Sequence, residues 1–181
     1  MFLRFTIACC LASTLAAQDI PQSATREIAA AANEFVATLD ESQQGKLIYD
    51  FRDEAQRKRW HYFPPGMVPR GGLRVGDLAE RQRAAAMRVV AAALSPQGYE
   101  KVLQIVESDE VLRKATRRNL GRDEYYISFL GQPRATEPWM IQFGGHHLAI
   151  NITLAGAQGT LAQARGGGEN SSERSPYRCS R

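Results

Sequence analysis

Residues 138–155 read PWMIQFGGHHLAINITLA and carry the clearest structural pattern in this chain. The two halves of this stretch, PWMIQF and HLAINITLA, are rich in aromatic, aliphatic and β-branched side chains, which favour strands. Between them lies Gly144-Gly145, a dipeptide that tolerates positive φ and can join antiparallel strands through a tight turn. The stretch therefore predicts a β-hairpin.

Alternation assigns the side chains of the second half to two faces, because successive residues of a strand point to opposite sides of the sheet. One face carries His146 and the aliphatic residues Leu148, Ile150, Ile152 and Leu154. The other face carries His147, Ala149, Asn151 and Thr153. We expect the aliphatic face to pack into the core and the second face to be polar.

The sequence upstream of the hairpin predicts helices. Apolar residues recur at three- and four-residue spacing over two long stretches, 25–41 and 77–95. Asp77 can cap the second stretch, and Pro96 with Gly98 would end it. Three shorter helices are predicted over 42–51, 99–106 and 110–118.

Residues 60–72, WHYFPPGMVPRGG, interrupt this helical half, because their prolines and glycines forbid regular structure. After Asp123 the sequence changes to YYISFLG, residues 125–131, which is typical of a strand. Helices followed by antiparallel strands indicate an α+β domain. We therefore expect an N-terminal helical half followed by an antiparallel β-hairpin or sheet.

Residues 1–17 are typical of a signal peptide. Arg4 precedes a short apolar run, and the small residues Ala16 and Ala17 favour cleavage before Gln18. Cys9-Cys10 offers lipidation as an alternative, although the residues before this pair lack the leucine-led pattern of that signal. We expect an exported protein, secreted or periplasmic.

The sequence after residue 17 argues against a membrane span and against an intramolecular disulfide. No later segment is long and apolar enough to span a bilayer, which needs about 20 residues, so no membrane span is expected. Cleavage would leave Cys179 as the sole cysteine, which excludes an intramolecular disulfide.

Charge argues against nucleic acid as a partner. The formal net charge of +4 comes from 23 basic and 19 acidic residues, and much of the excess lies near the two ends of the chain. The basic runs at 57–59 and 113–118 sit beside acidic residues, a pattern typical of solvated helix faces. An unidentified small molecule or extracellular ligand remains the expected partner.

Residues 163–181, QARGGGENSSERSPYRCSR, differ from the domain that we predict over 18–162. They contain three consecutive glycines and no aliphatic residue after Ala164, so they cannot build a core. Two explanations stay open, a genuine disordered tail and a sequence read out of frame.

The three histidines, His61, His146 and His147, are the candidates for chemistry. The adjacent pair His146 and His147 would bind one metal ion only if the turn distorts the backbone, since neighbours on a regular strand point apart. As catalytic groups we single out His147, His61 and Asn151, acting as ligands or as an acid and a base. The alternative is structural, with His146 packed under the sheet and His147 on the surface.

Several motifs recur together along the chain. They are WHYFP, GLRVGDLAERQR, ALSPQGY, Tyr126, Gly131 with Pro133, Trp139 and GGHHLAINIT. In this combination the sequence resembles the domain of unknown function 3500 family over residues 35–154. The resemblance implies an exported protein, but it transfers no catalytic residue, because the activity of the family is not established. Similar proteins continue beyond the hairpin, so this chain is expected to lack the family's C-terminal half.

Two functions from different classes follow. The first is an exported hydrolase-like enzyme that uses the histidines at the hairpin. The second is a non-catalytic extracellular binding or structural module. Signatures of serine hydrolases, HExxH metalloproteases, P-loop proteins and dinucleotide-binding proteins are absent from the sequence, which specifies no cofactor.

Overall fold

Seven strands form one mixed sheet in the part of the chain that the computed structural model describes, residues 18–19 and 21–165. Their order is β1-β7-β6-β5-β4-β2, and β3 also pairs with β4. The strands are β1 (Gln18–Asp19), β2 (Ile48–Tyr49), β3 (Leu73–Arg74), β4 (Tyr126–Leu130), β5 (Trp139–Gly144), β6 (Leu148–Ala155) and β7 (Gln158–Arg165). The predicted signal peptide, residues 1–17, and residues 166–181 of the predicted tail lie outside the described residues.

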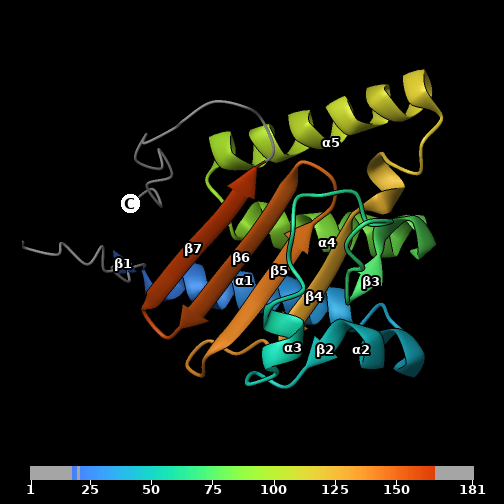
Figure 1. The fold of residues 1–181 in the computed structure, drawn as a ribbon. Coiled ribbons are helices and arrows are strands. Elements are labelled where there is room, and N and C mark those ends of the chain that lie inside the picture. Colours follow the sequence, from blue (N-terminus) through green and yellow to red (C-terminus); the bar gives the residue numbers. More distant parts are fainter. Residues whose placement is uncertain (1–17, 20, 166–181) are drawn as a thin grey trace, which may run out of the picture.

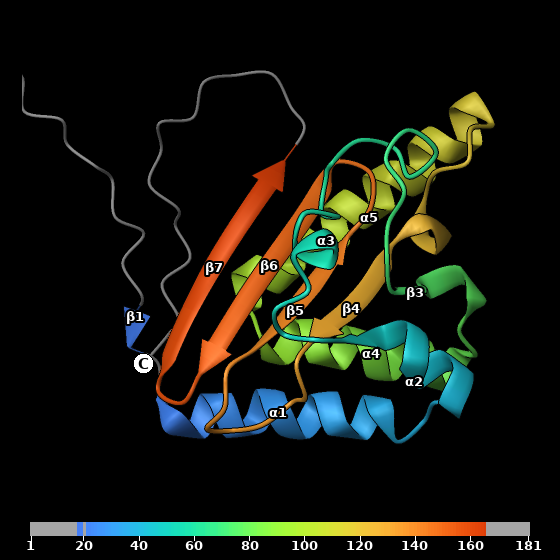
Figure 2. The same ribbon diagram turned by 60° about the horizontal axis from the view of Figure 1, so that its bottom comes forward.

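Helices are arranged unevenly about this sheet (Figures 1 and 2). The three long helices α1 (Gln22–Val36), α4 (Glu80–Ala92) and α5 (Pro96–Thr116) cover one face. The short helix α3 (Glu54–Arg57) crosses the other face, and α2 (Glu41–Leu47) lies at the edge beside β2. Two 3₁₀ turns, η1 (Val75–Asp77) and η2 (Arg122–Glu124), complete the elements. The predicted α+β class is confirmed.

The predicted hairpin is also confirmed. Strands β5 and β6 pair antiparallel, with a register that runs from Trp139 opposite Leu154 to Gly144 opposite Ala149. The aliphatic face of β6 belongs to the hydrophobic core, where it lies under the long helices. Strand β7, which we did not predict, pairs with the far side of β6 and continues to Arg165.

The turn of the hairpin differs from the prediction. The N–H of Gly145 donates to the carbonyl of Leu148 at 2.9 Å, so His146 and His147 occupy the turn in place of the glycines. His147 adopts a φ of 60°, the left-handed conformation. Gly145 instead allows the backbone to pack closely against Tyr125, because a Cβ at this position would lie 3.0 Å from the tyrosine ring.

Two predicted short helices form one. The predicted segments 99–106 and 110–118 belong to a single continuous helix, α5. Pro96 and Gly98 begin this helix rather than ending the previous one. The hydroxyl of Ser95 accepts the N–H of Gly98 at 3.1 Å, and proline fits the first helical position because it has no N–H to leave unpaired.

The predicted helix over 42–51 is shorter than expected. Helix α2 ends at Leu47, and Ile48–Tyr49 form β2, which pairs parallel with β4. Isoleucine and tyrosine favour an extended strand when a neighbouring strand offers backbone hydrogen bonds. The neighbour comes from far along the chain, so local sequence could not reveal it.

The core lies between the sheet and the long helices. Phe129 of β4 contacts Phe35 of α1 and Trp139 of β5 edge to face, with ring centroids 6.3 Å and 5.5 Å apart. All three side chains are fully buried. The apolar stripes predicted for 25–41 and 77–95 face this cluster, so both periodicity predictions are confirmed. The predicted cap is wrong, because α4 begins at Glu80 and Asp77 belongs to the preceding turn η1.

The opposite face of the sheet carries polar side chains, as expected, but they are buried. Ser128, Gln142 and Asn151 follow one another across β4, β5 and β6. The amide of Gln56 in α3 donates to Ser128 Oγ at 3.2 Å and to Gln142 Oε1 at 2.9 Å. Helix α3 therefore closes this face through hydrogen bonds.

No helix in residues 18–19 and 21–165 is long and apolar enough to cross a membrane.

Candidate functional site

Three metal-ligating side chains meet at the hairpin turn. Asp109 Oδ1 lies 3.0 Å from Nδ1 of His146 and 2.9 Å from Nδ1 of His147. One potential ligand atom from each of the three residues lies within 4.8 Å of the other two. We call Asp109, His146 and His147 the turn cluster.

Asp109 comes from α5, and no motif or periodicity in the sequence pointed to it. It falls where we expected a break between two short helices, and 37 residues separate it from His146 in the chain. The continuous helix instead brings Asp109 over the turn, where its side chain is fully buried. A buried carboxylate requires partners that offset its loss of hydration, and the turn supplies them.

Both histidines lie on the α5 side of the sheet. The alternation that placed His147 on the polar face with Asn151 is therefore wrong. The positive φ of His147 breaks the strand geometry at the turn, so its ring turns toward Asp109 together with that of His146. The ring centroids of His146 and His147 lie 3.6 Å apart. The distorted backbone of the turn thus brings the two rings together, as binding of one shared ion requires.

Tyr125 holds the second oxygen of the carboxylate. Its hydroxyl lies 2.7 Å from Asp109 Oδ2 and 2.9 Å from the carbonyl of His146, both of which accept from it. Burial and the Asp109 carboxylate raise the pKa of Tyr125, so the phenol keeps its proton as a donor. This leaves Asp109 Oδ1 directed at the two imidazoles.

Burial sets the charge of His146. Its side chain is 12% exposed, and desolvation lowers its pKa although Asp109 acts in the opposite direction. His146 is therefore neutral at neutral pH, the form in which imidazole binds a metal ion. His147 is 41% exposed, so the cluster opens to solvent on its side.

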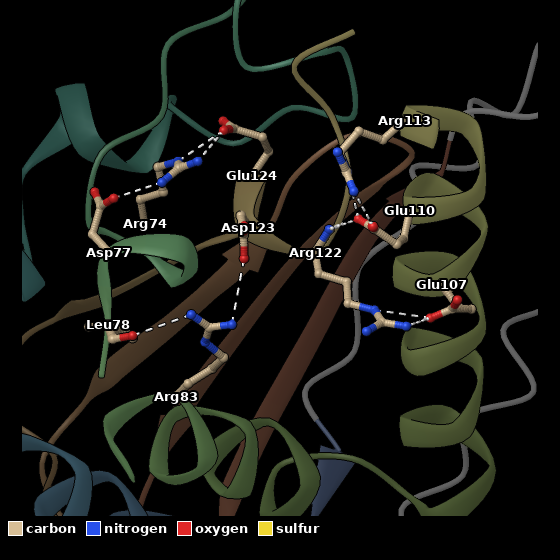
Figure 3. A network of polar contacts seen from close by, with 10 residues as sticks. All are labelled: Arg74, Asp77, Leu78, Arg83, Glu107, Glu110, Arg113, Arg122, Asp123 and Glu124. Atoms are coloured by element: carbon tan, nitrogen blue, oxygen red, sulfur yellow. Dashed lines mark hydrogen bonds and ion pairs between the residues drawn. The ribbon is translucent and has the colours of Figure 1, made fainter. Parts of the chain in front are cut away.

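Ion pairs fix the end of α5 next to the cluster (Figure 3). Glu110 accepts from the guanidinium of Arg113 at 2.6 Å and from the backbone N–H of Arg122 at 3.4 Å. The hydrogen bond from Arg113 lowers the pKa of Glu110 to about 2. The contact with Arg122 ties α5 to the segment that leads into β4, and so it helps to hold Asp109 near Tyr125.

Two of the predicted catalytic residues lie elsewhere. Asn151 sits on the opposite face of the sheet, beside Gln142. His61 lines a small cavity of about 20 Å³ with Gln56 and Ser128, and its Nδ1 accepts the N–H of Phe63. Its loop does reach the turn, because the N–H of His147 donates to the carbonyl of Tyr62 at 2.8 Å.

The turn cluster is compatible with a tetrahedral ion. Zinc binds histidine nitrogen and carboxylate oxygen at about 2.0–2.1 Å, which separates tetrahedral ligand atoms by roughly 3.3 Å. The observed separations of 2.9 and 3.0 Å need to widen by a few tenths of an ångström on binding. Each imidazole would bind through an unprotonated Nδ1 and carry its ring proton on Nε2, since bound histidines are unprotonated on the ligating nitrogen.

We expect Tyr125→Phe to weaken the cluster. The substitution removes the donor to Asp109 Oδ2 and leaves a buried carboxylate oxygen unpaired, which costs about 1–3 kcal/mol of unfolding free energy. Urea denaturation of the metal-free protein measures the change. Tyr126→Phe is the matched control, because that hydroxyl makes only a 3.5 Å contact with Glu124. Equal stabilities of the two variants would contradict the role of Tyr125.

Fold and site together define an α+β protein in which a helix carboxylate and two adjacent turn histidines form a potential metal site. The family model described as "Protein of unknown function (DUF3500)" matches residues 21–169. The chain belongs to this family, as its motifs predicted. No curated protein and no solved structure shows a significant match.

Proposed function

We propose that this protein is an exported metal-dependent enzyme of the hydrolase type, with one divalent ion held by Asp109, His146 and His147. The observation that carries the proposal is the buried Asp109 oxygen lying within 3.0 Å of both imidazoles. Export belongs to the same proposal and rests on the sequence of residues 1–17.

The ligand set favours zinc among divalent ions. Two imidazoles and one carboxylate are the donors of many catalytic zinc sites, which leave a fourth position for water. His147 is the exposed member of the cluster and marks the side from which water and a substrate would enter. A bound zinc ion would supply a water of pKa near 7 as the nucleophile.

Asp109 and Tyr125 have defined tasks in this proposal. The carboxylate adds the negative charge that a divalent ion needs in a site whose other ligands are neutral. Tyr125 orients that carboxylate through Oδ2 and leaves Oδ1 free for the ion. Such outer-shell hydrogen bonds typically raise metal affinity by 10–100-fold.

Metal titration tests the proposal. We expect the purified metal-free protein to bind one equivalent of Zn²⁺ in competition with a chromophoric chelator, and the unfolding temperature to rise when Zn²⁺ is present. The loaded protein is then assayed against p-nitrophenyl acetate and p-nitrophenyl phosphate. Absence of stoichiometric Zn²⁺ binding would overturn the metal site, and binding without hydrolysis of either ester would overturn the enzymatic part.

The second candidate is a non-catalytic binding or structural module. The full burial of Asp109 and the contacts of its carboxylate with Tyr125, His146 and His147 favour it, because the same contacts can serve only to fasten α5 to the hairpin. In this case the Asp109 contacts stabilise the fold, and Zn²⁺ adds no activity.

A further inference from the structure

A second cavity lies between α4 and α5. It has a volume of about 520 Å³, within the usual range for small-molecule sites. Its floor is formed by Tyr125 and Phe143, whose rings stack with centroids 5.6 Å apart. Figure 3 looks into this region, with α4 at the bottom and α5 at the right.

The walls of this cavity are mainly apolar. Met87 from α4 faces Leu103 and Val106 from α5, and Val75 closes one end. Leu103 is 44% exposed, so an apolar surface at the mouth stands open to solvent. Burying this surface against an apolar ligand would be favourable.

The charged residues at the mouth are not equivalent. Arg122 donates from Nε and Nη2 to Glu107, so each neutralises the other. Arg83 faces them across the gap in Figure 3 and has weaker partners. Its Nη1 lies 3.6 Å from Asp123 Oδ1, and its Nη2 donates to the carbonyl of Leu78 at 3.4 Å.

Arg83 also has a donor without an acceptor. Its Nε is buried and makes no hydrogen bond in the described part of the chain. A buried N–H without an acceptor costs free energy, and a ligand that supplies an acceptor would recover it once the guanidinium of Arg83 turns toward the cavity. A carboxylate fits best, because it can accept two parallel hydrogen bonds from one guanidinium.

We propose that this cavity binds an amphipathic monocarboxylate, with the apolar chain between α4 and α5 and the carboxylate on Arg83. The remaining acidic groups do not oppose this arrangement strongly. Glu107 is neutralised by Arg122, whereas Glu100 and Asp123 are exposed, so solvent screens their charges. The proposal stands independently of the metal site, since the ring of Tyr125 forms the wall between the cavity and Asp109.

Decanoate is the probe, with decan-1-ol as an uncharged probe of the same chain length. Isothermal titration calorimetry of the whole protein should give saturable binding of one decanoate per chain, and weaker binding of decanol. Arg83→Gln should lower the affinity for decanoate about tenfold or more, because a charge-assisted pair is lost, and leave that for decanol unchanged. Arg88→Gln is the matched control, an exposed arginine on the same helix that does not line the cavity.

A second variant tests the apolar wall. Leu103→Glu adds a like charge at the exposed mouth and should also weaken decanoate, while an exposed position tolerates the change. The proposal is overturned if decanoate does not saturate, if decanol binds equally well, or if Arg83→Gln and Leu103→Glu both match Arg88→Gln.

Discussion

Asp109→Asn should reduce the affinity of the protein for Zn²⁺ by at least about a hundredfold, since even loss of an outer-shell partner costs about 10–100-fold. The amide keeps the size of the carboxylate but loses its charge and one strong ligand atom. It can still accept from an imidazole, so the hairpin should form. Competition with a chromophoric chelator measures the affinity of variant and parent under the same conditions.

Glu107→Gln is the matched control for Asp109→Asn. Glu107 precedes Asp109 by two residues on α5, but it is exposed and paired with Arg122. Its removal should change the free energy of Zn²⁺ binding by no more than about 0.5 kcal/mol. If both variants bind Zn²⁺ as the parent does, the turn cluster is not the metal site.

Phe129→Ala should lower the free energy of unfolding by about 3–5 kcal/mol, the usual cost of truncating a buried phenylalanine. Phe129 is fully buried between Phe35 and Trp139, so neither ring can close the space without leaving its own contacts. Because domains are typically stable by only 5–15 kcal/mol, this is a large fraction of the total. Urea denaturation followed by circular dichroism measures it.

Phe63→Ala provides the same substitution at a position that is 41% exposed. Phe63 contacts the rings of His61 and Tyr62 in the loop and lies outside the core cluster. We expect a change of about 0.5 kcal/mol or less. Comparable losses for the two phenylalanines would mean that the sheet and α1 do not pack as described.

The candidate site could be predicted only in part. The histidine pair stands out because the chain has three histidines in all. The third member of the turn cluster, Asp109, does not stand out in the sequence. It is one of 19 acidic residues and lies in a stretch with little helical amphipathicity. The predicted break between 106 and 110 also concealed that α5 runs unbroken past Asp109.

Strand alternation predicts Asn151 on the face of His147, and His61 is a candidate as the third histidine of the chain, brought over from its loop. Asn151 instead lies buried beside Gln142, and His61 lies in the loop, where its Nδ1 accepts the N–H of Phe63. Ser128 and Gln142 of the same buried face bond to each other and to Gln56 of α3. Amide and hydroxyl side chains can be buried where neighbouring strands and α3 offer partners.

The sequence by itself determined the hairpin, the core face of β6, the apolar faces of α1 and α4, and the family. Each of these features depends on local periodicity or on motifs. Both are contained within short stretches of the chain. Only the tertiary structure decided that α5 is continuous, that β2 joins β4, and that both histidines turn toward Asp109. The physical reason is that these features depend on contacts between distant segments and on a positive φ at His147, which the packing around the turn imposes.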